Sequence, residues 1–407
     1  MKQTGPLKPL DEALRQLLQC ASPLSDAEIV STFDADGRVL AQDLVSALQV
    51  PPQDNSSMDG YAVRCADLEA GDALAVTQRI AAGASGEALA RGSVARIFTG
   101  APIPAGADAV VMQEDCKVLD DGKVLVQAAV VPGQWIRRAG EDIACGAVVL
   151  PRGARLTPAA LGLAASIGMS TLKVVRRPRV ALFSTGDELV MPGEVAPDQM
   201  KPGTIYNSNR FFLRALLLRL GCEVSDLGIV PDRLDATVQA LSSAAHEHDL
   251  ILTSGGVSVG EEDHIKPAVQ SLGSLDLWQL AIKPGKPFAY GRVQGAHLIG
   301  LPGNPVSSFV TFVLLVRPFL LRLQGLTQSS AGSILMPAHF TWPKADRRRE
   351  FLRARRNTQG GLDLFANQSS GVLTSVVWAD GLVDNPPGQT IAHGDSVRFI
   401  PLTEVLG

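Results

Sequence analysis

The sequence predicts a multidomain α/β plus β protein, with a central parallel α/β sheet domain, a small β domain and a C-terminal β domain. Three observations lead to this prediction. The chain has 407 residues, which is more than one ordinary domain needs. Strand-like and helical segments alternate from residue 179 to about 324, as in a parallel sheet with helices on both faces. Short strand-like segments between Gly and Pro turns fill residues 64–146 and 334–405.

The composition is that of an ordinary globular protein that is poor in charge. The chain is 46% hydrophobic and 19% charged, and its formal net charge of −4 gives no basic field for nucleic acid or a membrane surface. The five cysteines lie far apart and indicate reduced, mostly buried thiols, without a zinc site or a disulfide framework. The first six residues contain no apolar signal segment, and the longest apolar run, residues 309–316, is too short to span a bilayer. We therefore expect a cytoplasmic protein.

The N-terminal segment contains a helix, a strand-rich stretch and a polar loop. Apolar residues at helical spacing predict a helix at 10–20, and residues 28–50 suggest strands around a turn. Prolines and small polar residues then force a loop at 50–60. This loop carries four oxygen-bearing side chains in six positions, more than a turn requires: Asp54, Ser56, Ser57 and Asp59.

The predicted small β domain contains two further polar motifs. Residues 98–107 are rich in turn formers and precede a strand at 108–112. Residues 137–142 place two cations and two anions beside one glycine. On its own, such a cluster is typical of a solvated surface.

A helix is expected at 158–166, and alternating elements follow residue 178. We expect strands at 180–183, 224–230, 250–253, 275–282, 288–293 and 297–300, and helices at 207–220, 234–246, 263–272 and 306–323.

Three polar loops leave the carboxyl ends of these strands, which is where ligands bind in open α/β sheets: 184–188, 254–263 and 301–307. The middle loop has three glycines and two serines in its first seven residues, so that backbone N–H groups can approach a phosphate ahead of a helix. Thr185, Asp187 and Glu188 add oxygens from the neighbouring loop, and Asp263 lies where a Mg²⁺ that accompanies the phosphate would sit. A structural loop without a ligand is the alternative.

Two lysines form a stiff cationic corner at residues 283–287. Unpaired lysines on a rigid turn favour an anion site, and Ser307 opens the last helix at the same rim. The combination indicates a phosphate-bearing polyanion with a hard divalent cation. The chain has neither a Walker A lysine motif nor a G-x-G-x-x-G fingerprint, which argues against a P-loop NTPase and a dinucleotide enzyme.

Seven cations lie between residues 344 and 356. An RNA-binding arm is one interpretation, but aromatic interleaving is almost absent. As a strand, the segment places Phe351, Arg353 and Arg355 on one face, so we expect one or two arginines to reach an oxyanion. His246 and His248 are two residues apart, and we expect them to be solvated or capping rather than a zinc pair.

Together the motifs resemble the MoeA family of molybdopterin molybdenumtransferases, which is related to the E domain of gephyrin. The match is co-linear over nearly the whole chain and rests on seven motifs: 51–62, 99–104, 140–142, 184–189, 254–260 with Asp263, 283–287 and 301–305.

The resemblance implies an elongated four-domain homodimer with composite active sites. Its reaction inserts molybdate into adenylylated molybdopterin and releases AMP with the aid of Mg²⁺, and an adenylyltransferase that supplies the substrate is a possible partner. The implied domains are a linker domain (28–45 and 147–177), a small β lid (46–146), a molybdopterin-binding α/β domain (1–27 and 178–326) and a C-terminal β domain (327–407).

The resemblance also assigns roles to individual residues. Catalytic roles fall to Asp59, Thr99, Asp142, Glu188, Lys283 and Lys286. Binding roles fall to Thr185, Ser254, Gly255, Gly256, Ser258, Gly260, Pro302, Asn304, Pro305, Ser307, Arg353 and Ser375. The metal ion is expected at Glu188 and Asp263.

The sequence departs from the family pattern at Gln279, where relatives can have a lysine, at Ser56-Ser57, and loosely around 367–375. Two other functions stay open, namely adenylylation of molybdopterin, as in the related MogA family, and a non-enzymatic dimeric scaffold. The extra domains and the lysines at 283 and 286 favour insertion. The many anion-binding and acidic residues argue against a pure scaffold.

Overall fold

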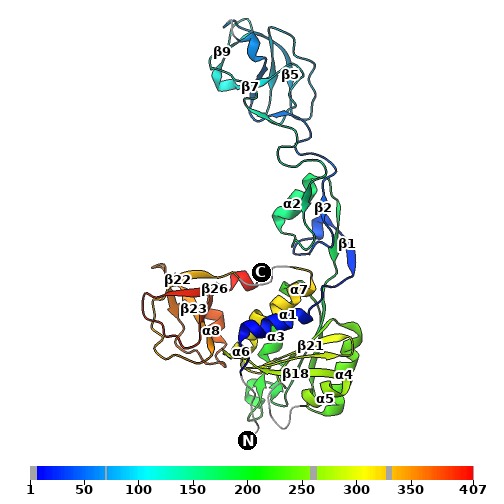
Figure 1. The fold of residues 1–407 in the computed structure, drawn as a ribbon, viewed down its shortest axis with the longest axis vertical. Helices are drawn as coiled ribbons and strands as arrows, with labels where there is room; N and C mark the ends of the chain where they lie inside the picture. The colour runs from blue at the N-terminus through cyan, green and yellow to red at the C-terminus, as the bar shows by residue number, and fades with distance from the viewer. Residues whose placement is uncertain (1–6, 69–70, 257–263, 327–331, 407) are drawn as a thin grey trace. The chain divides into compact units, whose positions relative to one another are not determined.

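The computed structural model describes residues 7–68, 71–256, 264–326 and 332–406 (Figure 1). The chain divides into two compact units. The larger unit comprises residues 1–28, 37–41 and 174–407, and the smaller unit comprises residues 29–36 and 42–173. The ranges of the four implied domains stay a prediction.

A six-stranded sheet forms the centre of the larger unit. Its order is β16 (Glu223–Val230), β13 (Arg179–Thr185), β17 (Leu250–Ser254), β21 (Ala296–Leu301), β20 (Pro287–Val293) and β18 (Gly273–Gln279). The first four strands are parallel to one another, but β20 is antiparallel to both of its neighbours. The prediction of a parallel sheet is therefore wrong at this edge. Only residues 294 and 295 join β20 to β21, and a two-residue connection makes an antiparallel hairpin.

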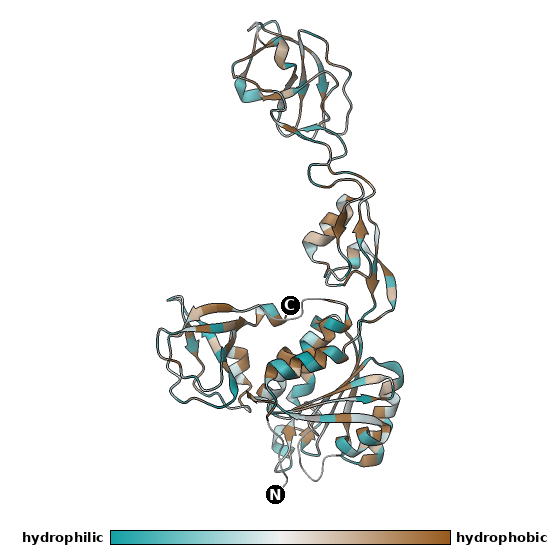
Figure 2. Cartoon of the chain, in the orientation of Figure 1, coloured by the Kyte–Doolittle hydropathy of each residue, from teal (hydrophilic) through white to brown (hydrophobic). Residues whose placement is uncertain are grey.

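Helices cover both faces of this sheet, as predicted (Figure 1). Because side chains alternate along a strand, β13 contributes Val180 and Leu182 to one core and Ala181 and Phe183 to the other. The first core contains α1 (Leu10–Cys20), α3 (Ser208–Arg219) and the helical segment 305–323. The second contains α4 (Leu234–Glu247) and α5 (Ile265–Leu272). Figure 2 shows the hydrophobic and hydrophilic sides of α1.

The helical segment 305–323 is continuous and mostly buried. It comprises α6 (Pro305–Thr311), a π-helical turn (Phe312–Val316) and α7 (Arg317–Leu323). Pro318 has no N–H for the preceding turn and its ring crowds a carbonyl there, which accounts for the widened turn. In the part of the chain that is described, this is the one helix long and apolar enough to cross a membrane, but 83% of its most apolar window is buried inside the protein. The prediction that the apolar run is too short is wrong, and a place in the core explains its composition.

A second six-stranded sheet fills the C-terminal part of the larger unit. Its order is β19 (Ile282–Lys283), β23 (Arg349–Arg356), β25 (Gly381–Asn385), β26 (Ser396–Pro401) and β22 (Ile334–Pro337), with β24 (Leu362–Leu364) also paired to β23. The short helices α8 (Thr374–Trp378) and α9 (Thr403–Leu406) accompany it. Strand β19 lies between β18 and β20 in sequence, so its parallel pairing with β23 joins the two sheets.

The smaller unit contains the predicted small β structure. Its main sheet has the order β5 (Ala75–Ile80), β6 (Ser93–Ile97), β4 (Gly60–Val63) and β7 (Ala109–Met112), with apolar clusters on both faces. The predicted helix at 158–166 is α2 (Pro158–Ser166). The remaining short strands of the chain are β1 (Ala27–Ser31), β2 (Leu44–Val45), β3 (Asn55–Ser56), β8 (Cys116–Val118), β9 (Val124–Val126), β10 (Ile136–Arg137), β11 (Val148–Leu150), β12 (Thr171–Val175), β14 (Leu189–Val190) and β15 (Ile205–Tyr206).

The five cysteines are free, as predicted, but only Cys222 is buried. Burial raises the pKa of its thiol to about 12. Cys20 and Cys145 are exposed, so the prediction of mostly buried thiols is wrong. Cys20 ends an amphipathic helix on its solvent side, and Cys145 lies in a turn.

Asn209, in the first turn of α3, ties together two loops at the carboxyl edge of the central sheet. Its Nδ2 atom donates to Ser254 Oγ and to the carbonyl oxygen of Gly303, both at 2.7 Å. The backbone N–H of Gly255 also donates to the carbonyl of Leu301 at 3.1 Å. The loops that follow β17 and β21 are therefore held together by side-chain and backbone hydrogen bonds.

We expect Asn209→Ala to lower the free energy of unfolding of the larger unit by about 1–3 kcal/mol, because two hydrogen bonds of about 0.5–1.5 kcal/mol each are lost. Urea denaturation measures this change. The matched control is Ser208→Ala, one residue earlier on the exposed side of the helix, with an expected change of about 0.5 kcal/mol or less. Equal effects of the two substitutions would show that the amide bridge does not stabilise this edge.

Candidate functional site

The carboxyl ends of β13 and β17 bring two predicted binding residues together. Thr185 and Ser254 are both buried at this edge. Gly255 and Gly256 follow with φ of +93° and +66°, and a Cβ on either glycine would lie 2.7 Å from an oxygen of Thr185. The backbone approaches so closely here that only glycine fits. The predicted residues Ser258, Gly260 and Asp263 lie outside the described residues.

Glu188 and Asp187 are exposed on the loop after β13. The carboxylate of Glu188 folds over Gly186, whose φ is +139°, and a Cβ on that glycine would meet Glu188 Oε2 at 2.5 Å. Gly186 therefore lets the carboxylate turn back toward the sheet edge. Among the described residues no group of three or more His, Cys, Asp or Glu could hold a metal ion. A cation at Glu188 would therefore need oxygens from a ligand as well as from Asp263.

The segment 301–307 joins this edge to the C-terminal sheet. Pro302 and Ser307 are buried, whereas Asn304 is exposed before Pro305, the first residue of α6. The backbone N–H of Val306 donates to the carbonyl of Ser370 at 3.0 Å. This bond places a loop of the C-terminal part against the start of α6.

The two lysines of the predicted cationic corner differ in their ion pairs. The prediction of unpaired lysines is wrong for Lys283. Its Nζ lies 3.0 Å from Glu350 Oε1 and 3.4 Å from Asp346 Oδ2. Two carboxylates that are distant in sequence reach it through the β19–β23 pairing. Lys286 is exposed, and no ion pair joins it to any residue in the described ranges.

Arg353 is the most deeply buried arginine of the basic segment, with 1% of its surface exposed. Its guanidinium donates only to neutral oxygens: Ser375 Oγ at 3.2 Å and the carbonyls of Phe351 at 2.9 Å and Ser369 at 3.4 Å. Burial lowers its pKa to about 10. In the same basic segment, Arg348 pairs with the carboxylate of Asp346 and Arg349 with that of Asp384.

Arg353 and Lys283 line one cavity of about 260 Å³, together with Trp342, Glu350, Gln368 and Ser369. Ser375 adjoins it through its hydrogen bond to Arg353. Lys283, Arg353 and Ser375, to which the resemblance assigns roles, are thus brought together, although Lys283 precedes Arg353 by 70 positions in sequence. A desolvated guanidinium without a carboxylate, beside a cavity, is suited to binding an oxyanion.

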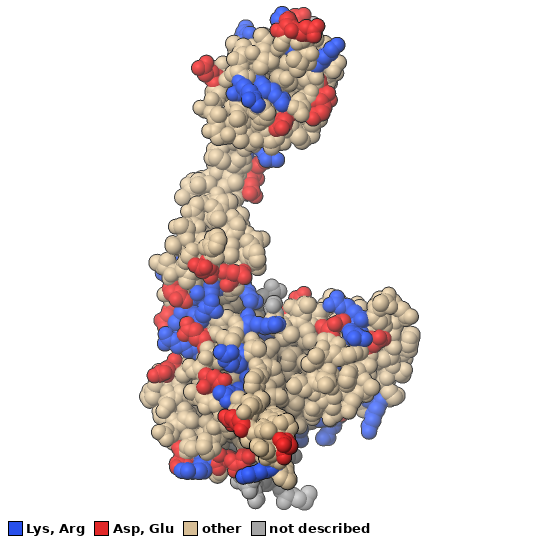
Figure 3. Space-filling model, turned by 180° about the vertical axis from the view of Figure 1, so that it is seen from behind, with Lys and Arg blue, Asp and Glu red and all other residues tan. Residues whose placement is uncertain are grey.

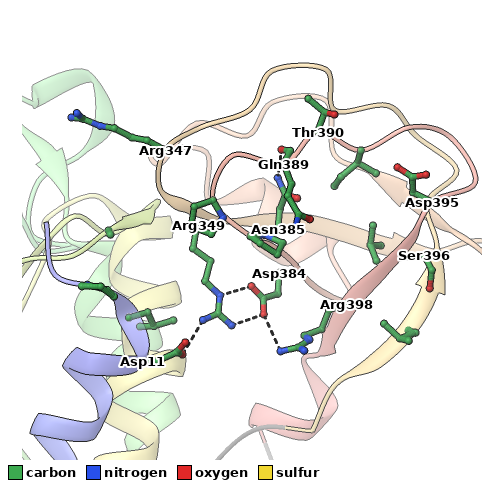
Figure 4. A pocket seen from close by; sticks show the side chains of 18 residues that line it. Asp11, Arg347, Arg349, Asp384, Asn385, Gln389, Thr390, Asp395, Ser396 and Arg398 are labelled. Atoms are coloured by element: carbon green, nitrogen blue, oxygen red, sulfur yellow. Dashed lines mark hydrogen bonds and ion pairs between the residues drawn. The ribbon is translucent and has the colours of Figure 1, made fainter.

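A larger cavity of about 810 Å³ lies elsewhere, between α1 and the C-terminal sheet (Figure 4). Its central cation is Arg349, which pairs with both oxygens of Asp384 at 2.6 Å and with Asp11 Oδ1 at 2.9 Å. Arg398 Nη1 lies 3.8 Å from the same Asp384 carboxylate. These charges compensate one another and tie α1 to the sheet. None of the predicted site residues lines this cavity.

The smaller unit positions the remaining predicted residues. Asp59 Oδ1 accepts hydrogen bonds from the backbone N–H and the hydroxyl of Thr99, both at 2.8 Å. These bonds, and to a smaller extent the charge of Arg96, lower the pKa of the Asp59 carboxyl. Asp142 is exposed, and its backbone N–H donates to the carbonyl of Val50.

The charged cluster at 137–142 is more than a solvated surface. Arg138 Nη1 lies 2.6 Å from Asp54 Oδ2, and the N–H of Ala139 donates to Asp54 Oδ1 at 2.8 Å. These contacts lower the pKa of Asp54, chiefly through the bond from Ala139. The polar loop at 50–60 and the charged cluster at 137–142 are therefore joined.

Sequence reasoning missed Asn209 and Glu350. Asn209 lies in the run Tyr-Asn-Ser-Asn at the start of the predicted helix 207–220, where asparagine is typical of a helix cap, and Asn207 is the residue that caps α3. Glu350 follows three arginines, where a carboxylate is expected to be solvated. At Gln279, where relatives can have a lysine, Oε1 is buried and has no hydrogen-bond partner among the described residues.

Three family models match successive parts of the chain. The MoeA N-terminal region (domain I and II) matches residues 8–168, a probable molybdopterin binding domain matches 181–322, and the MoeA C-terminal region (domain IV) matches 336–402. A protein of Haemophilus influenzae named molybdopterin molybdenumtransferase is 40% identical over 98% of this chain and 99% of its own length. Molybdopterin molybdenumtransferase 2 of Mycobacterium tuberculosis is 36% identical over 95% of this chain and 97% of its own.

Solved structures agree with these matches. The crystal structure of a molybdopterin biosynthesis MoeA protein from Pyrococcus horikoshii covers 97% of this chain and 100% of its own, with a TM-score of 0.85 and 29% identity. The sequence matches and this likeness extend over the α/β, small β and C-terminal parts together. The chain is therefore a member of the MoeA family.

Proposed function

We propose that this protein inserts molybdate into adenylylated molybdopterin and releases AMP, a step in molybdenum cofactor biosynthesis. The observation that supports this most is Arg353, whose buried guanidinium has no carboxylate partner among the described residues and lines a cavity with Lys283. The names of the relatives from H. influenzae and M. tuberculosis point to the same reaction. The five free cysteines accord with a reaction in the cytoplasm.

Molybdate is a dianion, and the cavity beside Arg353 offers what a dianion needs. Burial has already removed water from the guanidinium, so an incoming oxyanion meets an interaction that is stronger than it would be in water. Lys283 is held by Glu350 and Asp346, whereas Lys286 is exposed and has no ion pair with the described residues. We assign Arg353, Lys283, Lys286, Ser307 and Ser375 to the molybdate side.

We place the binding site for the phosphates of the substrate at the carboxyl edge of the central sheet. Thr185, Ser254 and the two glycines after it supply hydroxyl and backbone groups at close approach. A Mg²⁺ held by Glu188 and Asp263 would neutralise the charge that develops on the leaving AMP. The buried edge and its glycines exclude bulky side chains where the phosphates would lie.

The defining experiment mixes purified protein with adenylylated molybdopterin, Mg²⁺ and molybdate and follows AMP by chromatography. We expect AMP release that requires both molybdate and Mg²⁺. The relevant control omits molybdate and adds sulfate at equal ionic strength. Formation of adenylylated molybdopterin from ATP and free molybdopterin would identify the protein as an adenylyltransferase instead, and no reaction of either kind would leave a scaffold function.

Lys286→Ala should raise the molybdate concentration needed for half-maximal rate by roughly tenfold to a hundredfold, because a charge-assisted hydrogen bond is worth about 1.5–3 kcal/mol. The KM for the pterin should change much less. Lys173→Ala, which removes another exposed lysine in the smaller unit, serves as the matched control. Loss of pterin affinity with unchanged molybdate dependence would instead place Lys286 at the substrate phosphates.

We also propose that the protein is a homodimer in which Asp59, Thr99 and Asp142 of one chain complete the site of the other. Each unit exposes apolar side chains that a second copy would cover, namely Phe211, Leu218 and Leu227 on the larger unit and Ile29 and Phe33 on the smaller. Phe211 and Leu218 are seven positions apart on α3 and lie on one side of the helix. The adenylyltransferase that supplies the substrate is a proposed further partner.

Subunit exchange tests the composite site. Asp59→Asn and Asp263→Asn should each be inactive alone, and equal amounts should recover about a quarter of wild-type activity after random exchange, since half the dimers are mixed and half of their sites are intact. Mixing each variant with itself provides the control. Exchange that is verified by mass spectrometry without any recovery would show that each site is built within one chain.

A further inference from the structure

Two arginines share an aromatic ring on the main sheet of the smaller unit. Arg79 on β5 and Arg96 on β6 are register partners on neighbouring parallel strands. Phe98 lies two residues beyond Arg96 and therefore on the same side of the sheet. The guanidinium carbons lie 4.6 Å (Arg79) and 4.8 Å (Arg96) from the centre of the Phe98 ring. We call these three residues the arginine–phenyl cluster.

Neither arginine of the cluster has a carboxylate partner among the described residues. Arg96 donates to two neutral oxygens, the carbonyl of Gly60 at 3.0 Å and Gln113 Oε1 at 2.6 Å. Arg79 is exposed and makes no hydrogen bond within the described ranges. A guanidinium has five N–H donors, so most donors of the pair are free for a ligand. The phenyl ring holds both cations in place, because its face attracts positive charge.

The cluster adjoins two residues that the resemblance predicts to be catalytic. Thr99 directly follows Phe98, and it donates two hydrogen bonds to Asp59. The second oxygen of Asp59 has no hydrogen bond to any other residue that the structure describes. Arg96 acts on the Asp59 carboxylate through its charge, and Glu114 lies nearby, since it accepts a hydrogen bond from the Gln113 side chain that itself accepts from Arg96.

A half-buried ring with arginines stacked on it is a common feature of protein surfaces and by itself needs no ligand. Three features of this cluster together favour a bound anion. The two cations are adjacent on paired strands, where like charges repel one another, and no acidic side chain pairs with either. They also border Asp59 and Thr99, so that an anion bound to them would lie beside proposed catalytic groups.

We propose that Arg79 and Arg96 bind a tetrahedral oxyanion on the smaller unit. Two guanidinium groups side by side match such an anion, because each can donate two parallel N–H bonds to its oxygens. The anion is either a phosphate of the adenylylated substrate or molybdate, and only this identity rests on the proposed function. The phenyl ring of Phe98 pre-orders the cations, which lowers the entropy lost on binding.

Arginine modification by phenylglyoxal, followed by peptide mass spectrometry of the intact protein, tests the site at single residues. We expect saturating AMP or molybdate to slow modification of Arg79 and Arg96 by roughly tenfold, with unchanged modification of Arg91, an exposed arginine on the same unit. Protection by AMP alone assigns the site to phosphate, and protection by molybdate alone assigns it to molybdate. Equal modification rates with and without both anions would overturn the proposal.

Substitution supplies the second measurement. Arg79→Gln removes an exposed side chain that makes no hydrogen bond to the described residues, so the fold is not at risk. It should raise roughly tenfold the KM for molybdate if molybdate protects, or for the adenylylated substrate if AMP protects, with little change in kcat. Arg79→Lys should recover only part of the loss, because lysine keeps the charge without the paired donors. Arg91→Gln is the control. A wild-type protein that releases no AMP would refute the proposed reaction, whereas the modification result would still decide on the anion site.

Discussion

The structure of the larger unit depends on one buried carboxylate. Glu350 is 1% exposed, and a charge buried to that degree is tolerated only when it is paired and hydrogen-bonded. Its Oε1 accepts from Lys283 at 3.0 Å, and its Oε2 accepts from Trp342 Nε1 at 2.8 Å and Asn385 Nδ2 at 3.3 Å. Lys283 comes from the segment between β18 and β20, so satisfying Glu350 requires β19 to pair with β23. That pairing is what brings Arg353 to the cavity beside Lys283.

Local patterns were sufficient for most of the fold. Both α1, from helical spacing, and α2 were predicted to the residue, and alternation along residues 179–324 predicted the helices on both faces of a sheet (Figure 1). The helix predicted at 306–323 is also present, at 305–323, where it passes through a proline by widening one turn. The failure at β20 has a physical cause, because a two-residue connection sets the direction of that strand and periodicity carries no information on it.

The candidate site was predictable in its membership but only partly in its electrostatics. Motifs identified Thr185, Ser254, Lys283 and Arg353, and the structure brings the first two together at one edge and the last two at one cavity. Which cations are compensated could not be predicted, because the partners are distant in sequence: Asp346 and Glu350 reach Lys283 only through strand pairing. Asn209 was missed for the same reason, since its two acceptors are 45 and 94 positions away.

The pattern of charge compensation distinguishes structural cations from those available to a ligand. Figure 3 shows cations and anions interspersed over the surface it presents, and Arg176 with Asp249 and Arg349 with Asp384 form close pairs of the structural kind. Arg353 differs, because a buried cation without a counter-ion costs stability at neutral pH, where its lowered pKa of about 10 still leaves it protonated. Its stability cost falls only as pH rises from about 10 toward 12.5, where the folded state has already lost the proton and the unfolded chain still binds it. A cation retained at such a cost under working conditions is explained by an anion that binds it there. Exposed Arg79 and half-buried Arg96 meet the same criterion, because neither has a carboxylate partner among the described residues, and they are less deeply buried than Arg353.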